Sequence, residues 1–139
     1  MDPRIVAIRW MDEVWRQRRI DAIDALHAVD FVDRSPAPEQ ASDRAACLSG
    51  VRAFFEAFPD FEAVTEALIV EGNEVAVRWR TSGTQRGKFL GFAASGGTIT
   101  FHGIEILRVR NGQIVERWGE WDALSLLEQL RCLHPDQNS

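Results

Sequence analysis

Acid–base chemistry is the chemistry that the residues of the C-terminal half could perform. Glu105 lies in "FHGIEILRVR", and Glu120 and Asp122 lie in "RWGEWDALSL", all among tryptophans, isoleucines and leucines. Burial and mutual repulsion favour the protonated form of a carboxyl group, so one of these groups could hold a proton near neutral pH. General acid–base catalysis requires such a group. Together with His102, these carboxylates are the candidate catalytic residues.

A predicted hairpin turn indicates which of these side chains share a face. Asn111-Gly112 in "VRNGQI" is a strong signal for a two-residue type I′ turn, in which Arg110 pairs with Gln113. In that register the three carboxylates project from one face of the two strands, beside Trp118. A β-bulge would change the register, so His102 stays a candidate for the same group.

Structural roles are the alternative for these groups. Asp122 stands immediately before the helix-like "ALSLLEQL", where an N-cap residue belongs. Glu120 and Asp122 could also pair with one of three arginines, namely Arg78, Arg80 or Arg117. The spacing does not decide between capping and catalysis for Asp122, and it favours the catalytic role for Glu105 and Glu120. A lone strand histidine such as His102 is more often structural.

Aromatic side chains could line a pocket beside these groups. The candidates, which are core residues first, are Trp118, Trp15, Trp79, Phe58 and Phe55. No pair of histidines or cysteines has metal-ligand spacing, so we expect no metal. No glycine-rich phosphate loop follows a strand, so nucleotide binding has no support.

Composition limits the class of protein. A chain of 139 residues with 45% apolar residues is long enough for one domain with a real core and too short for two. The net charge of −5 argues against a nucleic-acid partner. The apolar runs are too short to span a bilayer, and the N-terminus does not resemble a signal peptide, so we expect no membrane partner and a cytoplasmic location.

The periodicity of apolar residues predicts helices followed by strands. We expect helices over about 5–18, 20–29 and 47–58, a brief strand at 31–33, longer strands at 61–70, 74–82, 98–110 and 113–121, and a final helix at 123–130. This order predicts an α+β domain over residues 1–133, with a frayed tail at 134–139. Helices packed on one face of a curved antiparallel sheet would form a half-open cone, whose inside is a natural pocket for a small molecule.

With these elements in place, the chain resembles the SnoaL-like polyketide cyclases of the nuclear transport factor two-like superfamily. The resemblance covers nearly the whole chain and includes "DFVDRSP", "FFEAFPDFE", "VAVRWRTSGTQRGKFLG" and, most specifically, "RNGQIVERWGEWDALSLLEQL". It implies a cone-shaped α+β fold, also described as a cystatin-like α+β barrel. It also implies a homodimer formed through the sheet, a small hydrophobic substrate, and no metal or organic cofactor.

The resemblance also implies a reaction, the closure of a ring by intramolecular aldol condensation through carboxylate acid–base catalysis. By motif the catalytic acid falls in "WGEWD", where Asp122 matches best. Related epoxide hydrolases would use Glu120, and related ketosteroid isomerases use an acid at the place of Glu105 to hold an oxyanion. The chain has no tyrosine to supply a donor for those two reactions. We therefore expect a cyclase or isomerase of polyketide-like carbonyl compounds. An epoxide hydrolase or epoxide-opening cyclase and a non-catalytic binding module remain alternatives.

Overall fold

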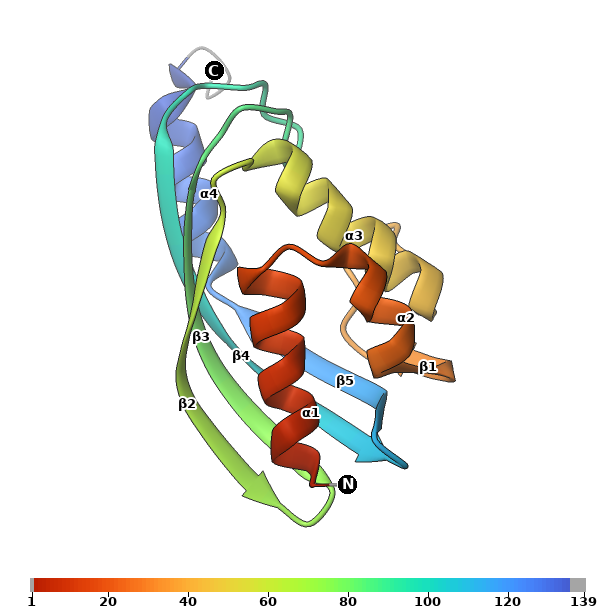
Figure 1. The fold of residues 1–139 in the computed structure, drawn as a ribbon. Coiled ribbons are helices and arrows are strands. Elements are labelled where there is room, and N and C mark those ends of the chain that lie inside the picture. Colours follow the sequence, from red (N-terminus) through yellow and green to blue (C-terminus); the bar gives the residue numbers. More distant parts are fainter. Residues whose placement is uncertain (1, 136–139) are drawn as a thin grey trace.

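A curved five-stranded sheet forms the body of the molecule (Figure 1). The computed structural model describes residues 2–135. Along the sheet the strand order is β1-β5-β4-β3-β2. Their bounds are β1 His27–Asp33, β2 Glu62–Glu71, β3 Glu74–Thr84, β4 Thr98–Arg110 and β5 Gln113–Trp121. Strands β2 to β5 form an antiparallel meander, whereas β1 lies parallel to β5.

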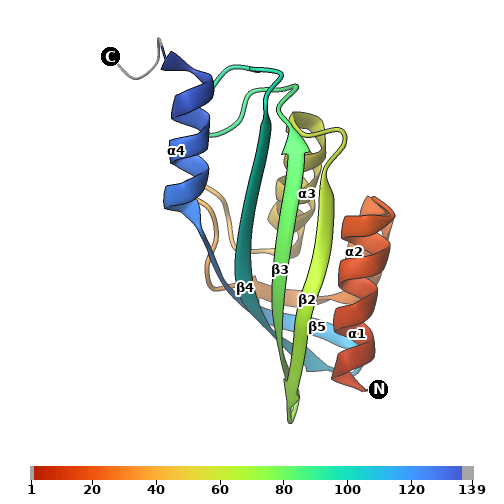
Figure 2. The same cartoon turned by 90° about the vertical axis from the view of Figure 1, so that its left-hand side faces the viewer.

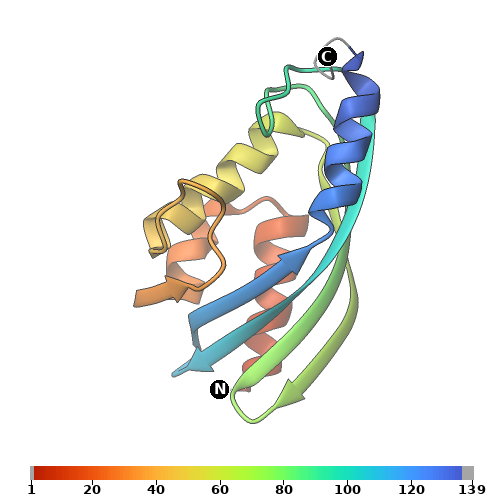
Figure 3. The same cartoon turned by 180° about the vertical axis from the view of Figure 1, so that it is seen from behind.

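The helices cover one face of this sheet. They are α1 (Pro3–Arg9), α2 (Ile23–Leu26), α3 (Arg44–Ala57) and α4 (Ala123–Leu133), with a π-helical segment at Trp10–Arg16 and a 3-10 turn at Ile20–Ala22. Helices α1 to α3 lie on the concave face, and no helix of the described residues crosses the outer face of β2 to β4 (Figure 2). Seen from behind, α4 runs beside β4 at one end of the sheet (Figure 3). The predicted α+β cone is confirmed, and its sheet is open. Within residues 2–135, no helix has the length and apolar character needed to cross a bilayer.

Strict alternation along β4 determines which side chains face the helices. From Ile99 to Val109 every odd residue is buried, and the even residues between them are exposed or half-buried. This period of two is what a strand with one covered face requires. The odd set includes Glu105, which is 4% exposed among apolar neighbours. The sheet therefore carries one carboxylate from the middle of β4 into the interior.

The N-terminal third differs from the sequence prediction. The second helix was predicted to continue to residue 29, but it ends at Leu26. Strand β1 begins at His27 and pairs with β5. Valines and a phenylalanine in "HAVDFVD" favour extended backbone, and tertiary pairing decides the outcome. At the other end, the predicted frayed tail lies mostly outside the described residues. His134, which is described, interacts through its ring nitrogens with the carbonyls of Leu130 and Ala93.

A β-bulge changes the predicted register of β4 and β5. Val109 pairs with Ile114, as the turn predicts, but Arg108 pairs with Glu116, which leaves Val115 as an extra residue. Because side chains alternate, this single residue moves the rest of β5 to the opposite face. The predicted register was therefore wrong beyond the first pairs, and so was the prediction that three carboxylates share one face.

Candidate functional site

A cavity of about 230 Å³ lies between the concave face of the sheet and the helices, and we call it the inner cavity. Its wall is largely aromatic and contains Trp10, Trp15, Phe54, Phe61, Trp79, Phe101 and Trp121. Three polar side chains of the lining form one bonded group, Asp33, Glu105 and Arg117, to which Ser35 is joined by its backbone N–H. An aromatic wall with a few convergent polar groups is typical of small-molecule sites.

Glu105 is held by two donors within this group. The indole Nε1 of Trp10 donates to Glu105 Oε1 over 2.8 Å, and Arg117 Nε donates to Glu105 Oε2 over 2.7 Å. Both bonds are short because the acceptor carries charge. The register places Glu105 opposite Gly119, and a Cβ atom at Gly119 would lie 2.4 Å from Arg117 Nη2. Glycine at this position therefore leaves the room that the guanidinium occupies.

Asp33 binds the other side of the same guanidinium. Arg117 Nη1 donates to Asp33 Oδ1 over 3.1 Å and to Oδ2 over 3.3 Å, and the backbone N–H of Ser35 donates to Oδ1 over 2.9 Å. Burial by itself would lower the pKa of Arg117, but the negative charges of Glu105 and Asp33 outweigh burial and raise it. Arg117 is therefore permanently charged between two carboxylates.

The π-helical segment brings two tryptophans to the inner cavity. Trp10 and Trp15 are five residues apart, a spacing that would put them on different sides of an α-helix but on one side of a π-helix. Their rings meet edge to face with centroids 5.7 Å apart. Trp15 then packs against the phenylalanines of α3, while Trp10 reaches Glu105.

A histidine and a cysteine lie behind this wall. His27 is 1% exposed, its Nδ1 donates to the Ile23 carbonyl over 2.8 Å, and its Nε2 is 3.9 Å from Cys47 Sγ. Burial lowers the pKa of His27, so the ring stays neutral near pH 7, and burial raises the pKa of Cys47 to about 12. Cys47 lines the inner cavity as a protonated thiol and is not a nucleophile.

The candidate catalytic residues separate into two groups. Glu105 lines the inner cavity, whereas the shifted register places Glu120 opposite Ile104 on the outer face, away from it. Asp122 does not line the cavity either. Its carboxylate caps α4 by accepting from Ser125 N over 3.1 Å and lies 3.8 Å from His102 Nε2. The capping alternative for Asp122 is confirmed.

The aromatic candidates also separate. Trp15 and Trp79 lie in the wall of the inner cavity. The bulge places Trp118 on the outer face, where the guanidinium of Arg108 lies 5.3 Å from its ring. Phe58 is fully buried, and Phe55 packs behind Trp15 with ring centroids 5.6 Å apart, so neither was correctly placed in the wall.

Sequence reasoning missed several residues of the site, among them Asp33, Ser35, Arg117, Trp10 and Trp121. Asp33 and Arg117 are direct partners in the parallel pairing of β1 with β5. Only knowledge of that pairing would have linked the two residues. Parallel strands that pair are far apart in the chain, so no local sequence pattern predicts the pairing.

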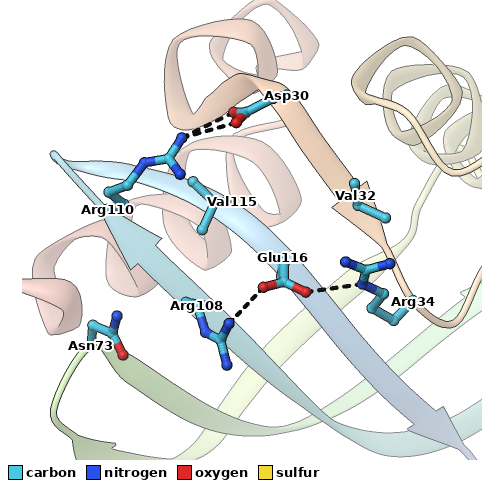
Figure 4. A pocket seen from close by; sticks show the side chains of 8 residues that line it. All are labelled: Asp30, Val32, Arg34, Asn73, Arg108, Arg110, Val115 and Glu116. Atoms are coloured by element: carbon cyan, nitrogen blue, oxygen red, sulfur yellow. Dashed lines mark hydrogen bonds and ion pairs between the residues drawn. The ribbon is translucent and has the colours of Figure 1, made fainter.

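A second hollow, of about 290 Å³, lies where β1, β5 and β4 meet (Figure 4). Glu116 binds Arg34 over 2.9 Å and Arg108 over 2.7 Å, and Asp30 binds Arg110 over 3.1 Å. Figure 4 shows these side chains pointing toward one another, so both carboxylates of the hollow are paired with arginine. Its lining lacks the aromatic wall of the inner cavity, which remains the better candidate site.

Comparison with known proteins agrees with this architecture. IdmH of Streptomyces antibioticus, a candidate polyketide cyclase, is 26% identical in sequence to this chain. The match covers 94% of this chain and 99% of IdmH, and the two structures superpose with a TM-score of 0.80. A candidate SnoaL-like polyketide cyclase of a Jannaschia species is 25% identical, with coverages of 92% and 90% and a TM-score of 0.82. AclR of Streptomyces galilaeus, a candidate hydroxylase, is 24% identical over 92% and 94%, with a TM-score of 0.81, and supports the fold alone.

No protein of curated function matches the chain. A family model described as SnoaL-like polyketide cyclase matches residues 5–130, which is most of the sequence. The matched segment runs from the first helix to the last one and contains every polar residue of the inner cavity. By this match the chain belongs to the SnoaL-like polyketide cyclase family.

Proposed function

We propose that the chain is an enzyme that closes or rearranges a ring in a polyketide-like carbonyl compound, with Glu105 as its acid–base group. The observation that carries the proposal is the position of Glu105, a carboxylate 4% exposed in the lining of an aromatic cavity. Family membership supports the reaction class. The proposal thus assigns to Glu105 on β4 the catalytic role that the sequence suggested for "WGEWD".

Glu105 has the capacity to accept a proton despite its two hydrogen bonds. Each carboxylate oxygen offers two lone pairs, and Trp10 and Arg117 occupy one on each oxygen. A free lone pair takes the proton from a carbon next to a substrate carbonyl. The resulting enolate carbon bonds to a second carbonyl carbon of the same molecule, and the proton returns to the new alkoxide oxygen. No atom is lost, so the net reaction is an isomerisation by ring closure.

The arrangement of donors suits this step. Trp10 and Arg117 fix the carboxylate in place, which removes the entropy cost of orienting the base. The aromatic wall excludes water from the reacting atoms and strengthens their electrostatic interactions. A positioned general base of this kind contributes about 10²–10⁴-fold to the rate.

A binding module is the second candidate function. Glu105 and Asp33 are both engaged with Arg117, so the polar group of the inner cavity is also what a purely structural ion pair would look like. Such a module would bind planar carbonyl compounds and leave them unchanged. The two functions differ in whether bound ligand exchanges protons.

Proton exchange into 1-tetralone, a bicyclic aryl ketone with an α-carbon, tests the proposal. We expect the protein to accelerate deuterium uptake at that carbon from D₂O, as followed by NMR. Glu105→Gln should lower the enzymatic rate by about 10²–10⁴-fold because it removes the base. Glu120→Gln, the same change on the outer face, should leave the rate unchanged, and thermal melts establish that both variants fold.

Two results would count against the enzyme. Exchange that persists in a folded Glu105→Gln variant removes Glu105 from the mechanism. Tetralone binding by the wild-type protein with no exchange above that of buffer favours the binding module.

A further inference from the structure

The ionisable groups of the inner cavity do not balance in charge. Among the described residues that line it, the carboxylates of Asp33 and Glu105 face a single cation, the guanidinium of Arg117. His27 lies behind the wall, but burial lowers its pKa and keeps it neutral near pH 7. The polar group therefore carries a net charge of −1.

Asp33 holds the less neutralised part of this charge. Glu105 receives Arg117 at 2.7 Å and the indole of Trp10 at 2.8 Å, one donor on each oxygen. Asp33 shares one guanidinium nitrogen between its oxygens at 3.1 and 3.3 Å, and its other donor is a neutral backbone N–H. The weaker pairing leaves Oδ2 of Asp33 with the greatest capacity for another donor.

The side chain is enclosed enough for that capacity to matter. Asp33 is 7% exposed and lines the inner cavity. Water screens a charge poorly at such a position, so an incoming ligand charge interacts with it strongly. Indole rings attract cations more strongly than other aromatic side chains do, and Trp15, Trp79 and Trp121 lie in the wall of the same cavity.

We propose that the inner cavity selects its ligand by charge and that Asp33 is the residue that sets this specificity. The ligand class is a planar aromatic carbonyl compound that carries a protonated amine, and an equivalent compound with a carboxylate is rejected. The inference rests on the proposed function for the identity of the site. The inference adds that the substrate carries a protonated amine where it meets the polar group of the inner cavity.

The repulsion of anions follows from the same geometry. A ligand carboxylate in the inner cavity would meet two like charges and one guanidinium that is already bonded on both sides. The Nη2 group of Arg117 donates to neither carboxylate, so it is the donor that an anion could reach, and the anion would bind there against the net charge of −1.

Three naphthalene probes of equal shape test the proposal by calorimetry at pH 7.5. They are 2-naphthylmethylamine, a cation, 2-naphthylmethanol, a neutral compound, and 2-naphthoate, an anion. We expect affinity for the wild-type protein to fall in that order, with the amine bound at least about tenfold more tightly than the acid, a difference of about 1.4 kcal/mol. This order needs no variant and no turnover.

Asp33→Asn tests whether Asp33 is the residue that causes the charge preference. The substitution makes the polar group neutral and keeps an oxygen for Ser35 N and Arg117, so the ratio of amine to acid affinity should fall close to one. Glu128→Gln, at an exposed position of α4, gives the protein the same change in net charge and should leave the ratio of amine to acid affinity unchanged. Asp33→Glu, which keeps the charge, should retain the preference.

Several outcomes would overturn the proposal. Naphthoate bound as tightly as the amine, an unchanged ratio in a folded Asp33→Asn variant, or no binding of any probe would each do so. Failure of the acid–base mechanism is detected separately, since it is read from deuterium exchange in Glu105→Gln, whereas the charge preference is read from probe affinities of the wild-type protein.

Discussion

Asp122 has a structural task that its local sequence describes well. It follows the last residue of β5 and precedes α4, and its carboxylate accepts the backbone N–H of Ser125 over 3.1 Å. A helix start leaves several N–H groups without partners, and a side-chain oxygen at the N-cap satisfies one of them. The residue that best matches the catalytic motif therefore has a capping role through Oδ1, while its Oδ2 lies 3.8 Å from His102 Nε2.

We expect Asp122→Ala to lower the free energy of unfolding by about 1 kcal/mol, because the cap is lost. Urea denaturation measures this change. Asp122→Ser, which keeps an N-cap oxygen, should restore most of the stability. Deuterium exchange into tetralone should be unaffected in both variants. A large loss of exchange in a stably folded Asp122→Ser variant would return Asp122 to the mechanism.

At the level of single residues, sequence reasoning placed some members of the site and missed others. Glu105, Trp15 and Trp79 were candidates and do line the inner cavity. Asp33 and Arg117 were not candidates, because each gains its meaning from the other across a parallel strand pair. Local spacing identifies a side chain that is unusual for its surroundings, whereas a pair formed across 84 residues needs the fold.

Among the elements, β4 shapes the inner cavity through a missing side chain. Gly103 pairs with Trp79 on β3 and with Trp121 on β5, and both indoles line the inner cavity. A Cβ atom at Gly103 would lie 2.4 Å from Cζ2 of Trp79 and 2.6 Å from the carbonyl oxygen of Glu120. The indole of Trp79 therefore lies across the glycine.

We expect Gly103→Ala to displace Trp79 and to cost about 1–3 kcal/mol of stability, as overpacking does. The affinity for 2-naphthylmethanol should fall with it. Gly50→Ala is a control for stability alone, because Gly50 also lines the inner cavity; its new Cβ atom would meet the flexible end of Gln40 at 3.2 Å and lies in α3, where alanine is favoured over glycine. Equal losses in the two variants would contradict the assigned role of Gly103.

The sequence predicted the bounds of the strands better than the irregularities within the strands and helices. The bounds of β2 to β5 agree with the predicted strands to within a few residues, because alternation and the Asn111-Gly112 turn are local signals. The bulge at Val115 and the π-helical segment at Trp10–Arg16 were not predicted. Neither the bulge nor the π-helical segment has a distinctive local residue pattern. Whether each one is stable depends on contacts with residues elsewhere in the fold.

For the whole molecule, the outer face of the sheet matters because none of the helices in Figure 2 lies over β2 to β4 on that side. Ile104 and Ile106 of β4 are 51% and 37% exposed there. The sheet register places Arg78 on β3 beside Ile104, and Glu120 on β5 on its other side. This row of the outer face therefore runs from basic to apolar to acidic across three strands.

We expect this face to form a homodimer whose two-fold axis runs along β4, since that axis brings Arg78 of one copy to Glu120 of its partner. Sedimentation should give twice the 15.7 kDa chain mass. Arg78→Glu should weaken the dimer, and combining it with Glu120→Arg should restore it. Leu124→Glu, at an exposed leucine of α4, should have no effect. A wild-type protein that sediments as a single chain at micromolar concentration would refute the expectation.

The bonded group of the inner cavity also has a consequence for how the chain folds. It joins Trp10 to Glu105 across 95 residues and Asp33 to Arg117 across 84. Contacts between such distant segments are formed slowly, because the chain must first lose the entropy of long loops. We therefore expect Trp10 and Asp33 to find their partners only after β4 and β5 have been synthesised, so that the polar end of the cavity assembles late.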